Sequence, residues 1–205
     1  FAMLKSGAEV GADIVCGDAQ PFGLPMSFGG PSLGYMACVD ALKRRLPGRI
    51  VGQTTDAQGR RAFVLTLQAR EQHIRREKAS SNICSNQAHC ALTASIYLNY
   101  MGPEGLGDVA KACYAKAHFL AERLCEIPGV KLKYGGPFFH EFVTILPGPA
   151  QAVERALAKE GVLSGLPLGQ NEMLWCVTEK AGAAQLNSVA GVTRLALADG
   201  KGASL

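Results

Sequence analysis

The stretch GADIVCGDAQPFGLPMSFGGP, residues Gly11 to Pro31, starts like a strand and continues like a loop. Its apolar run Ala12–Cys16 is flanked by glycines, which is typical of a buried strand. From Gly17 to Gly34 glycine and proline recur so often that we predict a loop. At the tip of that loop lies Gln20, whose carboxamide is neither a nucleophile nor a titrating group. The stretch therefore predicts a pocket-shaped turn with no reactive side chain at its apex.

The composition bounds the class of protein. The chain has 205 residues, of which 48% are apolar and 19% charged, as in a globular protein of one or two domains. Its net charge of +4 is too small an excess to predict a nucleic-acid partner. We find no signal peptide and no apolar run of membrane-spanning length, so we expect no membrane partner and a cytoplasmic location. The chain opens inside an amphipathic pattern without an initial methionine, which suggests a fragment of a longer protein.

The seven cysteines form no C-x-x-C pair and lie mostly within apolar runs. We interpret them as small, reduced, buried hydrophobic residues. With four scattered histidines and no paired spacing, the sequence predicts no metal site. The cysteines are Cys16, Cys38, Cys84, Cys90, Cys113, Cys125 and Cys176.

Downstream of the loop, Tyr35–Leu42 is apolar enough for either a strand or a short helix. The runs Ile50–Gln53 and Arg61–Leu67 flank the turn residues Asp56 and Gly59, which predicts a hairpin.

A long helix is predicted next, from Ile83 to Met101, with an N-cap at Ser80, Ser81 or Asn82. It is apolar nearly all round, which is typical of a buried helix. Gly102-Pro103 should end it, because glycine permits a left-handed cap and proline prevents continuation.

The remainder predicts a small domain. A helix with an apolar stripe from Leu106 to Leu124 is followed by strands, a helix beginning at Pro149, two more strands and a final helix over Gly182–Ala198. This order suggests helices packed on one face of a mainly antiparallel sheet. The predicted strands are Val130–Tyr134, Phe139–Leu146, Val162–Leu168 and Met173–Thr178. We place the domains at 1–83 and 104–205, with 84–103 as a linking helix.

The densest polar cluster is Gln68 to Gln87, and three interpretations of it stay open. It could be a solvated connector, a phosphate or nucleic-acid site, or a docking surface whose arginines bind a partner's carboxylates. His73 lies within it, without a neighbouring nucleophile, and is better read as a structural hydrogen-bonder than as a general base. Farther on, His140 and Glu141 are adjacent in a predicted strand, so they should point to opposite faces and not form a pair.

Three segments carry a family resemblance. They are GADIVCGDAQPFGLPMSFGGPSLGYMA from Gly11, PGRIVGQTTDAQGRRAFVLTLQ from Pro47, and REQHIRREKASSNICSNQ from Arg70. Together they resemble the P-protein of the glycine cleavage system, a glycine decarboxylase that depends on pyridoxal phosphate (PLP). The match is strong over the first half of the chain, and the third segment is long and specific.

The resemblance implies an α/β fold, the carboxy-terminal part of a PLP-dependent transferase of the aspartate aminotransferase type (fold type I). Residues 1–83 would be a remnant of the large domain and residues 104–205 the small one. In many bacteria the enzyme is split into two homologous subunits, and the chain is similar to subunit 1. Subunit 2 carries the lysine that binds PLP as a Schiff base, and Gln20 stands at the matching position here. The resemblance thus implies a chain without a catalytic residue or cofactor of its own.

The partners implied are P-protein subunit 2, the lipoyl H-protein and glycine as substrate of the complex. The fold type places active sites near subunit interfaces, so the polar segment supplies the candidate interface residues. These are Arg70, His73, Arg75, Arg76, Lys78, Asn82 and Asn86. Two other functions stay open: a pure assembly module, or an independent PLP-dependent transferase that uses a lysine elsewhere in the chain.

Overall fold

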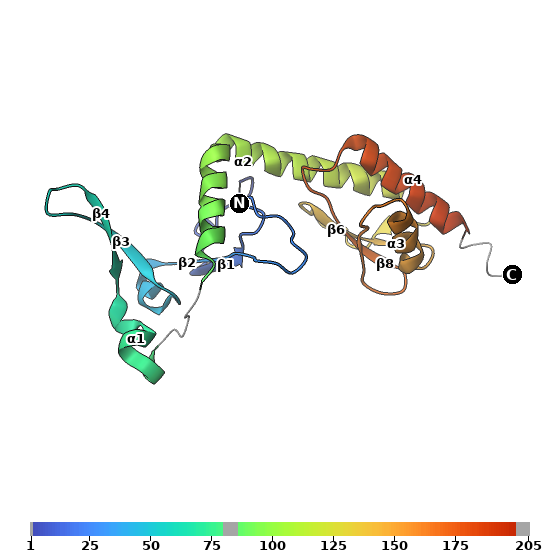
Figure 1. The fold of residues 1–205 in the computed structure, drawn as a ribbon. Helices are drawn as coiled ribbons and strands as arrows, with labels where there is room; N and C mark the ends of the chain where they lie inside the picture. Colours follow the sequence, from blue (N-terminus) through green and yellow to red (C-terminus); the bar gives the residue numbers. More distant parts are fainter. Residues whose placement is uncertain (1, 80–85, 200–205) are drawn as a thin grey trace. The chain divides into compact units, whose positions relative to one another are not determined.

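The computed structural model describes residues 2–79 and 86–199, in two compact units that divide between Gly102 and Pro103 (Figure 1). Each unit has its own strands and helices. None of the helices in the described part of the chain is long and apolar enough to cross a membrane.

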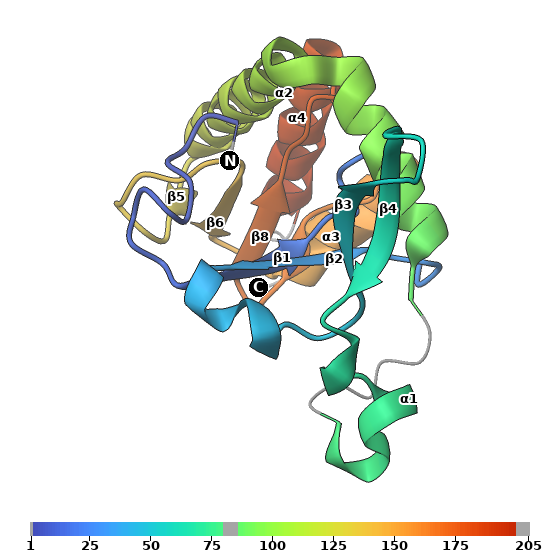
Figure 2. The same cartoon turned by 90° about the vertical axis from the view of Figure 1, so that its left-hand side faces the viewer.

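The first unit contains two antiparallel strand pairs. Strand β1 (Ile14–Asp18) pairs with β2 (Gly34–Cys38), and the loop between them is the glycine-rich stretch predicted from the sequence. Strand β3 (Ile50–Thr55) pairs with β4 (Arg61–Thr66), which confirms the predicted hairpin (Figure 2). The carboxylate of Asp56 closes its turn by accepting hydrogen bonds from the backbone N–H groups of two residues within the turn.

Short helices connect these strands to the long helix. The run Tyr35–Leu42 is divided: its start belongs to β2, and its end to the 3-10 helix η1 (Asp40–Arg45). After β4 come three helices of a single turn each: η2 (Gln68–Arg70), α1 (Gln72–Arg75) and η3 (Arg76–Lys78).

Helix α2 (Ala88–Cys125) consists of two helical segments joined at Gly102. The backbone of Gly102 has φ 61° and ψ −179°, a conformation essentially restricted to glycine. Pro103 follows as the first residue of the second segment, where its missing N–H costs nothing. The prediction that Gly102-Pro103 separates two helices is therefore confirmed. The predicted cap at Ser80, Ser81 or Asn82 lies outside the described residues.

The prediction that the first unit's apolar segments are buried is wrong for this chain. On the first segment of α2, Leu92 is 57% exposed and Ile96 62% exposed. On β1, within the run Ala12–Cys16, Ile14 is 53% exposed. The physical reason is that two-stranded sheets and one helix segment present more apolar surface than they can cover by contacting each other.

The second unit is a four-stranded antiparallel sheet with helices. Its strands lie in the order β5 (Lys131–Leu132), β6 (Glu141–Ile145), β8 (Glu172–Cys176) and β7 (Leu166–Pro167). The edge strands β5 and β7 are two residues long, much shorter than predicted, because a strand extends only as far as its neighbour offers hydrogen bonds.

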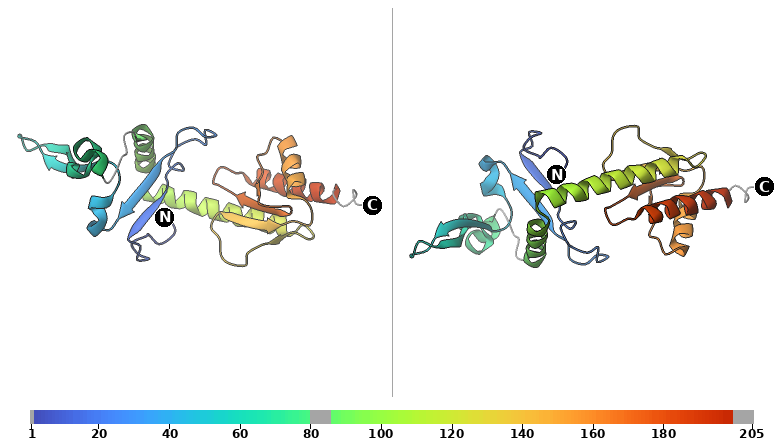
Figure 3. Two further views of the ribbon diagram at one scale, coloured as in Figure 1. Left: turned by 90° about the horizontal axis from the view of Figure 1, so that it is seen from below. Right: turned by 90° about the horizontal axis from the view of Figure 1, so that it is seen from above.

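Helix α3 (Ala150–Lys159) begins directly after Pro149, as predicted, and helix α4 (Ala183–Asp199) ends the described chain. Figure 3 shows these helices and the sheet from two sides.

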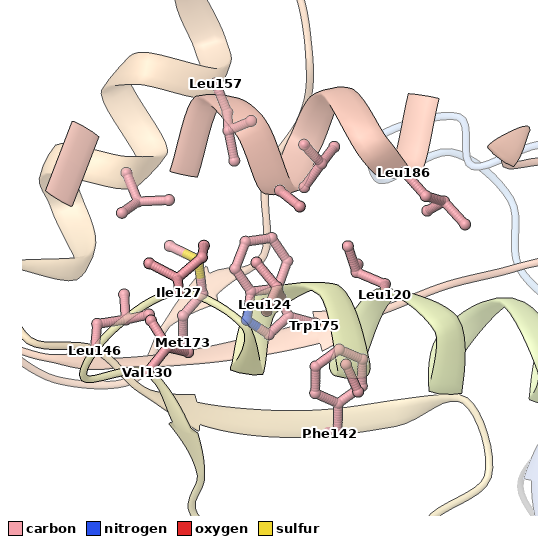
Figure 4. Packing of buried hydrophobic residues seen from close by; sticks show 14 of the residues in the cluster. Leu120, Leu124, Ile127, Val130, Phe142, Leu146, Leu157, Met173, Trp175 and Leu186 are labelled. Atoms are coloured by element: carbon pink, nitrogen blue, oxygen red, sulfur yellow. The ribbon is translucent and has the colours of Figure 1, made fainter. Parts of the chain in front are cut away.

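The core of the second unit lies between its sheet and its helices. Side chains of β6 and β8, such as Trp175, contact Leu124 of α2, Leu157 of α3 and Leu186 of α4 in one buried cluster (Figure 4). Because strand side chains alternate, these contacts place the three helices on one face of the sheet, which confirms the predicted two-layer arrangement. Within the core, Nε1 of Trp175 donates a hydrogen bond of 2.8 Å to Oγ1 of the buried Thr144.

The cysteines correct another prediction. Cys90 and Cys113 are buried, but Cys16, Cys125 and Cys176 are exposed, and Cys38 is half-buried. Cys84 lies outside the described residues. The apolar neighbours in the sequence did not decide the burial, because on a strand or helix consecutive residues face different sides.

Candidate functional site

The loop after β1 is held together by Gln20. Its side-chain Nε2 donates hydrogen bonds to the carbonyl oxygens of Pro25, at 2.7 Å, and Met26, at 3.2 Å. Its backbone N–H donates to the carboxylate of Asp18 at 2.9 Å, and its own carbonyl accepts from the N–H of Leu24 at 3.1 Å. A primary carboxamide has two N–H donors, and both have carbonyl partners here. The side chain that lacked an evident role in the sequence therefore fastens the start of the loop to its middle.

Two further contacts position this loop. Ala19 is buried, and its N–H donates to the carbonyl of Leu33 across the loop's base. At Gly23, with φ +85°, an added Cβ would lie 2.9 Å from Cβ of Tyr97 on α2. Glycine is required there both for the positive φ and for the close approach to the helix. The loop is thus packed against the first segment of α2.

Two lysines near the Gln20 loop and the basic segment in the sequence, Lys43 and Lys78, are exposed. Nζ of Lys43 forms an ion pair with Asp40 at 2.8 Å in an exposed setting, and Lys78 is exposed in a basic segment. Neither side chain is buried, so neither lies in a pocket that excludes water from the amine.

In the basic segment, residues 70–78, two arginines donate hydrogen bonds to backbone carbonyls, and all side chains except those of Arg70 and Glu71 are exposed. The guanidinium of Arg70 donates to the carbonyl of Leu46 and, at 2.6 Å, to that of Gly48, and only 11% of this side chain is exposed. It therefore ties η2 to the turn after η1. His73, Arg75, Arg76 and Lys78 are exposed on α1 and η3, and Nε of Arg75 donates a 3.0 Å hydrogen bond to the carbonyl of Ala69.

Of the two asparagines predicted with this segment, Asn86 has a structural contact. Its Oδ1 accepts a 3.0 Å hydrogen bond from the N–H of Ala88 at the start of α2. This is the bond of a helix cap, which satisfies a backbone donor that has no partner within the helix. Asn82 lies outside the described residues.

The prediction that His140 and Glu141 do not form a pair is wrong. Atoms of His140, Glu141 and Cys176 that can bind a metal all lie within 4.8 Å of one another. Strand alternation did not apply, because β6 begins at Glu141 and His140 precedes it in a bend. Burial raises the pKa of the Cys176 thiol, and the nearby Glu141 carboxylate raises it further.

A second thiol, that of Cys113, and a second histidine, His118, have partners outside the group of His140, Glu141 and Cys176. Sγ of Cys113 lies 3.5 Å from Oε2 of Glu179, and burial is the main cause that raises the pKa of this thiol. The ring of His118 stacks on Phe138 at 4.0 Å between centroids and lies 3.1 Å from its carbonyl oxygen. His118 is thus a packing residue.

Comparison with known proteins settles the family. The model of the family described as glycine cleavage system P-protein matches residues 1–192. The chain belongs to this family. Among P-protein relatives, the chain is 52% identical over 186 residues to "Probable glycine dehydrogenase (decarboxylating) subunit 1" of Desulforamulus reducens, covering 88% of this chain and 42% of the relative. It is 50% identical over 204 residues to the protein of the same name from Moorella thermoacetica, covering 97% of this chain and 46% of the relative.

Solved structures agree with the P-protein assignment. The crystal structure of a glycine decarboxylase (P-protein) of the glycine cleavage system, in inhibitor-bound form, matches with a TM-score of 0.91 and 45% identity, covering 95% of this chain and 46% of that one. An aspartate aminotransferase of Thermus thermophilus matches with a TM-score of 0.57 and 16% identity, over 94% of this chain and 51% of that one. The second likeness supports the fold alone, that of PLP-dependent enzymes of fold type I, as the sequence predicted. The chain spans less than half the length of the subunit 1 relatives it matches.

Proposed function

We propose that this chain is the carboxy-terminal part of subunit 1 of a heteromeric glycine dehydrogenase (decarboxylating) in a bacterial cytoplasm, and that it is the half that does not anchor the coenzyme. The observation that carries the proposal is the hydrogen bonding of Gln20. Its carboxamide is a fixed structural element of the loop, where subunit 2 would have the PLP lysine.

The residues of this chain do not fit PLP as a covalent ligand. An amide nitrogen delocalises its lone pair into the carbonyl and does not condense with an aldehyde as an amine does. In addition, both N–H groups of Gln20 are already donated to Pro25 and Met26. When bound on the partner subunit, PLP would supply the electron sink for decarboxylation of glycine, and the aminomethyl group would pass to the lipoyl H-protein. The contribution of this chain is then to hold the loop and to complete the assembly.

The assembly surface that we propose is the exposed basic set His73, Arg75, Arg76 and Lys78. Exposed arginines bind carboxylates through two parallel hydrogen bonds, which suits a partner surface with aspartate or glutamate. Arg70 supports this set indirectly, because its bonds to Leu46 and Gly48 fix the element that precedes it. Asn82 and Asn86 remain candidates of the same surface.

The charge-reversal variant Arg75→Glu with Arg76→Glu, made in the full-length subunit, tests the surface. We expect its association with subunit 2, measured by analytical ultracentrifugation, to weaken at least tenfold while its thermal unfolding is unchanged. The matched control is Arg155→Glu with Lys159→Glu, an equal charge change on exposed positions of α3. If association persists and glycine decarboxylation falls, the segment reaches the active site instead. If neither changes, the assignment of this segment is wrong.

The anchoring of PLP is tested by borohydride reduction of the assembled enzyme, followed by peptide mass spectrometry. We expect the pyridoxyl group on a lysine of subunit 2 alone. A pyridoxylated lysine on this chain would overturn the proposal and favour an independent PLP-dependent transferase. Glycine turnover by the full-length subunit without its partner would do the same. A complex that forms and works equally well with Gln20 replaced would point to a plain assembly module.

A further inference from the structure

Three potential metal ligands meet at one end of the sheet in the second unit. Glu141 is the first residue of β6 and Cys176 the last of β8, and the register of the antiparallel pair places them directly opposite each other. Directly opposed residues share a face of the sheet, with Cβ atoms about 4.5–5.5 Å apart. Their neighbours Phe142 and Trp175 are buried in the core, so Glu141 and Cys176 belong to the other face.

His140 completes the group. Its carbonyl oxygen accepts a 3.1 Å hydrogen bond from the N–H of Val177, which ties the residue before β6 to the residue after β8. Its ring lies edge-on to Phe139, and the buried Nδ1 has no hydrogen-bond partner among the described residues. A buried polar atom without a partner costs about 1–3 kcal/mol. The imidazole is thus held in place beside a carboxylate and a thiol, with unused bonding capacity.

We propose that His140, Glu141 and Cys176 bind one Zn²⁺ ion. Imidazole, carboxylate and thiolate are the three ligand types that zinc accepts in proteins, and the thiolate favours it over Mg²⁺ or Ca²⁺. In a tetrahedral zinc site the ligand atoms lie about 3.3–3.7 Å apart, given metal–ligand distances of about 2.0–2.3 Å. The three atoms here are all within 4.8 Å of one another, so small side-chain rotations close the site. On binding, the thiol proton leaves to solvent and a zinc–sulfur bond forms.

The site is accessible and has an open coordination position. Glu141 and Cys176 are both exposed, and a hollow lined by Tyr134, Phe138 and Val143 adjoins Glu141. Three protein ligands leave the fourth tetrahedral position to water or to a small anionic or thiol ligand. No step of the proposed glycine chemistry uses these residues, and they belong to the unit that does not contain Gln20.

Zinc titration of the full chain, reduced and freed of metal, tests the site. In competition with a chromophoric chelator at neutral pH, we expect one equivalent of Zn²⁺ to bind. His140→Ala, Glu141→Gln and Cys176→Ser should each weaken binding by about tenfold or more. The matched controls are His89→Ala and Cys125→Ser, at exposed positions outside the group, which should leave the affinity unchanged. Absence of binding by the unaltered chain, or equal binding by the Cys176→Ser variant, overturns the proposal.

A second measurement uses only the unaltered chain, so it does not depend on whether a variant folds. The exposed thiols of the unaltered chain are alkylated with iodoacetamide and the rates are read for each cysteine by peptide mass spectrometry. Zn²⁺ should slow the alkylation of Cys176 at least tenfold and leave that of Cys125 unchanged, since both are exposed in the same unit. Co²⁺ in place of Zn²⁺ should add a thiolate-to-metal absorption band. Equal protection of the two cysteines, or no band, shows non-specific metal binding and refutes the site.

Discussion

The two units differ in how they bury apolar side chains. In the second unit, side chains from three helices and two central strands form one buried cluster around Leu124, Leu157 and Trp175. In the first unit, the buried apolar residues among those described are Ala19, Cys90 and Ala94, all small. Large apolar side chains there are exposed instead: Val51, Phe63, Val64, Leu65, Leu92, Ile96 and Tyr100 are among them.

The second unit thus has a hydrophobic core of its own, whereas the first unit exposes apolar side chains that it cannot cover by itself. A pair of strands is at best marginally stable in water, and the first unit is built from two such pairs. Exposed apolar area of this extent marks a surface that other protein covers. The subunit 1 relatives are more than twice as long as the matched region, so the additional surface can come from the same polypeptide or from a partner.

The largest expected effect contrasts a core leucine with an exposed one. Leu124→Ala should lower the free energy of unfolding of the second unit by about 2–5 kcal/mol, because the fully buried side chain leaves a cavity. Leu92→Ala should change it by less than about 0.5 kcal/mol. Trp175, the only tryptophan, lies in the core of the second unit, so its fluorescence during urea unfolding measures that unit. Equal effects of the two variants would show that the units do not have separate stability.

A smaller effect is expected at the loop. Gln20→Glu replaces two donors by a carboxylate that faces the carbonyl oxygens of Pro25 and Met26, so the loop should lose about 1–3 kcal/mol of local stability. The measurement is hydrogen exchange of the Leu24 amide, which donates to Gln20, and it should become faster.

Gln53→Glu, on the exposed surface of β3, is the matched control for this loop variant and should leave the Leu24 rate as it is. For both variants, the midpoint of urea unfolding reported by Trp175 fluorescence should stay unchanged. Unaltered exchange in Gln20→Glu would mean that the carboxamide does not hold the loop.

The smallest expected effect is the pH dependence of alkylation at Cys125 in the second unit. Burial raises the pKa of the Cys125 thiol, because removal from water disfavours the charged thiolate. The thiolate is the reactive form, so at pH 8 Cys125 should be alkylated more slowly than the cysteine of an unstructured peptide blocked at both ends, and its rate should rise to a plateau at higher pH. Rates at each pH from peptide mass spectrometry provide the test. A half-maximal rate at or below the pH found for that peptide would contradict the raised pKa of this thiol.

The helices and the positions of the strands of the second unit could be predicted from the sequence, because their apolar side chains repeat with helical or strand period and are buried within the unit itself. Strand lengths could not, since Val162–Leu168 is apolar throughout but only Leu166–Pro167 pairs with β8. In the first unit, the period of Leu92 and Ile96 indicates a face to be buried and carries no information on which polypeptide buries it.

The sequence contains the Gln20 loop as one continuous motif, so the loop could be found before the structure was known. Its hydrogen bonds could not, because the carbonyl partners of Gln20 depend on how the loop folds back. The group of His140, Glu141 and Cys176 is assembled by strand register across β6 and β8. The sequence signal was a His-Glu pair at the start of one strand and a cysteine at the end of another, which has meaning only once the pairing is known.

The conformation of Gly102 has a practical consequence for protein engineering. A side chain at Gly102 would strain the backbone, so the boundary between the two units is tied to this residue. A hybrid subunit that exchanges everything after this glycine for the corresponding region of a relative would cut no strand pair and would keep the buried cluster of the second unit complete. Such hybrids offer a direct way to compare what each unit contributes.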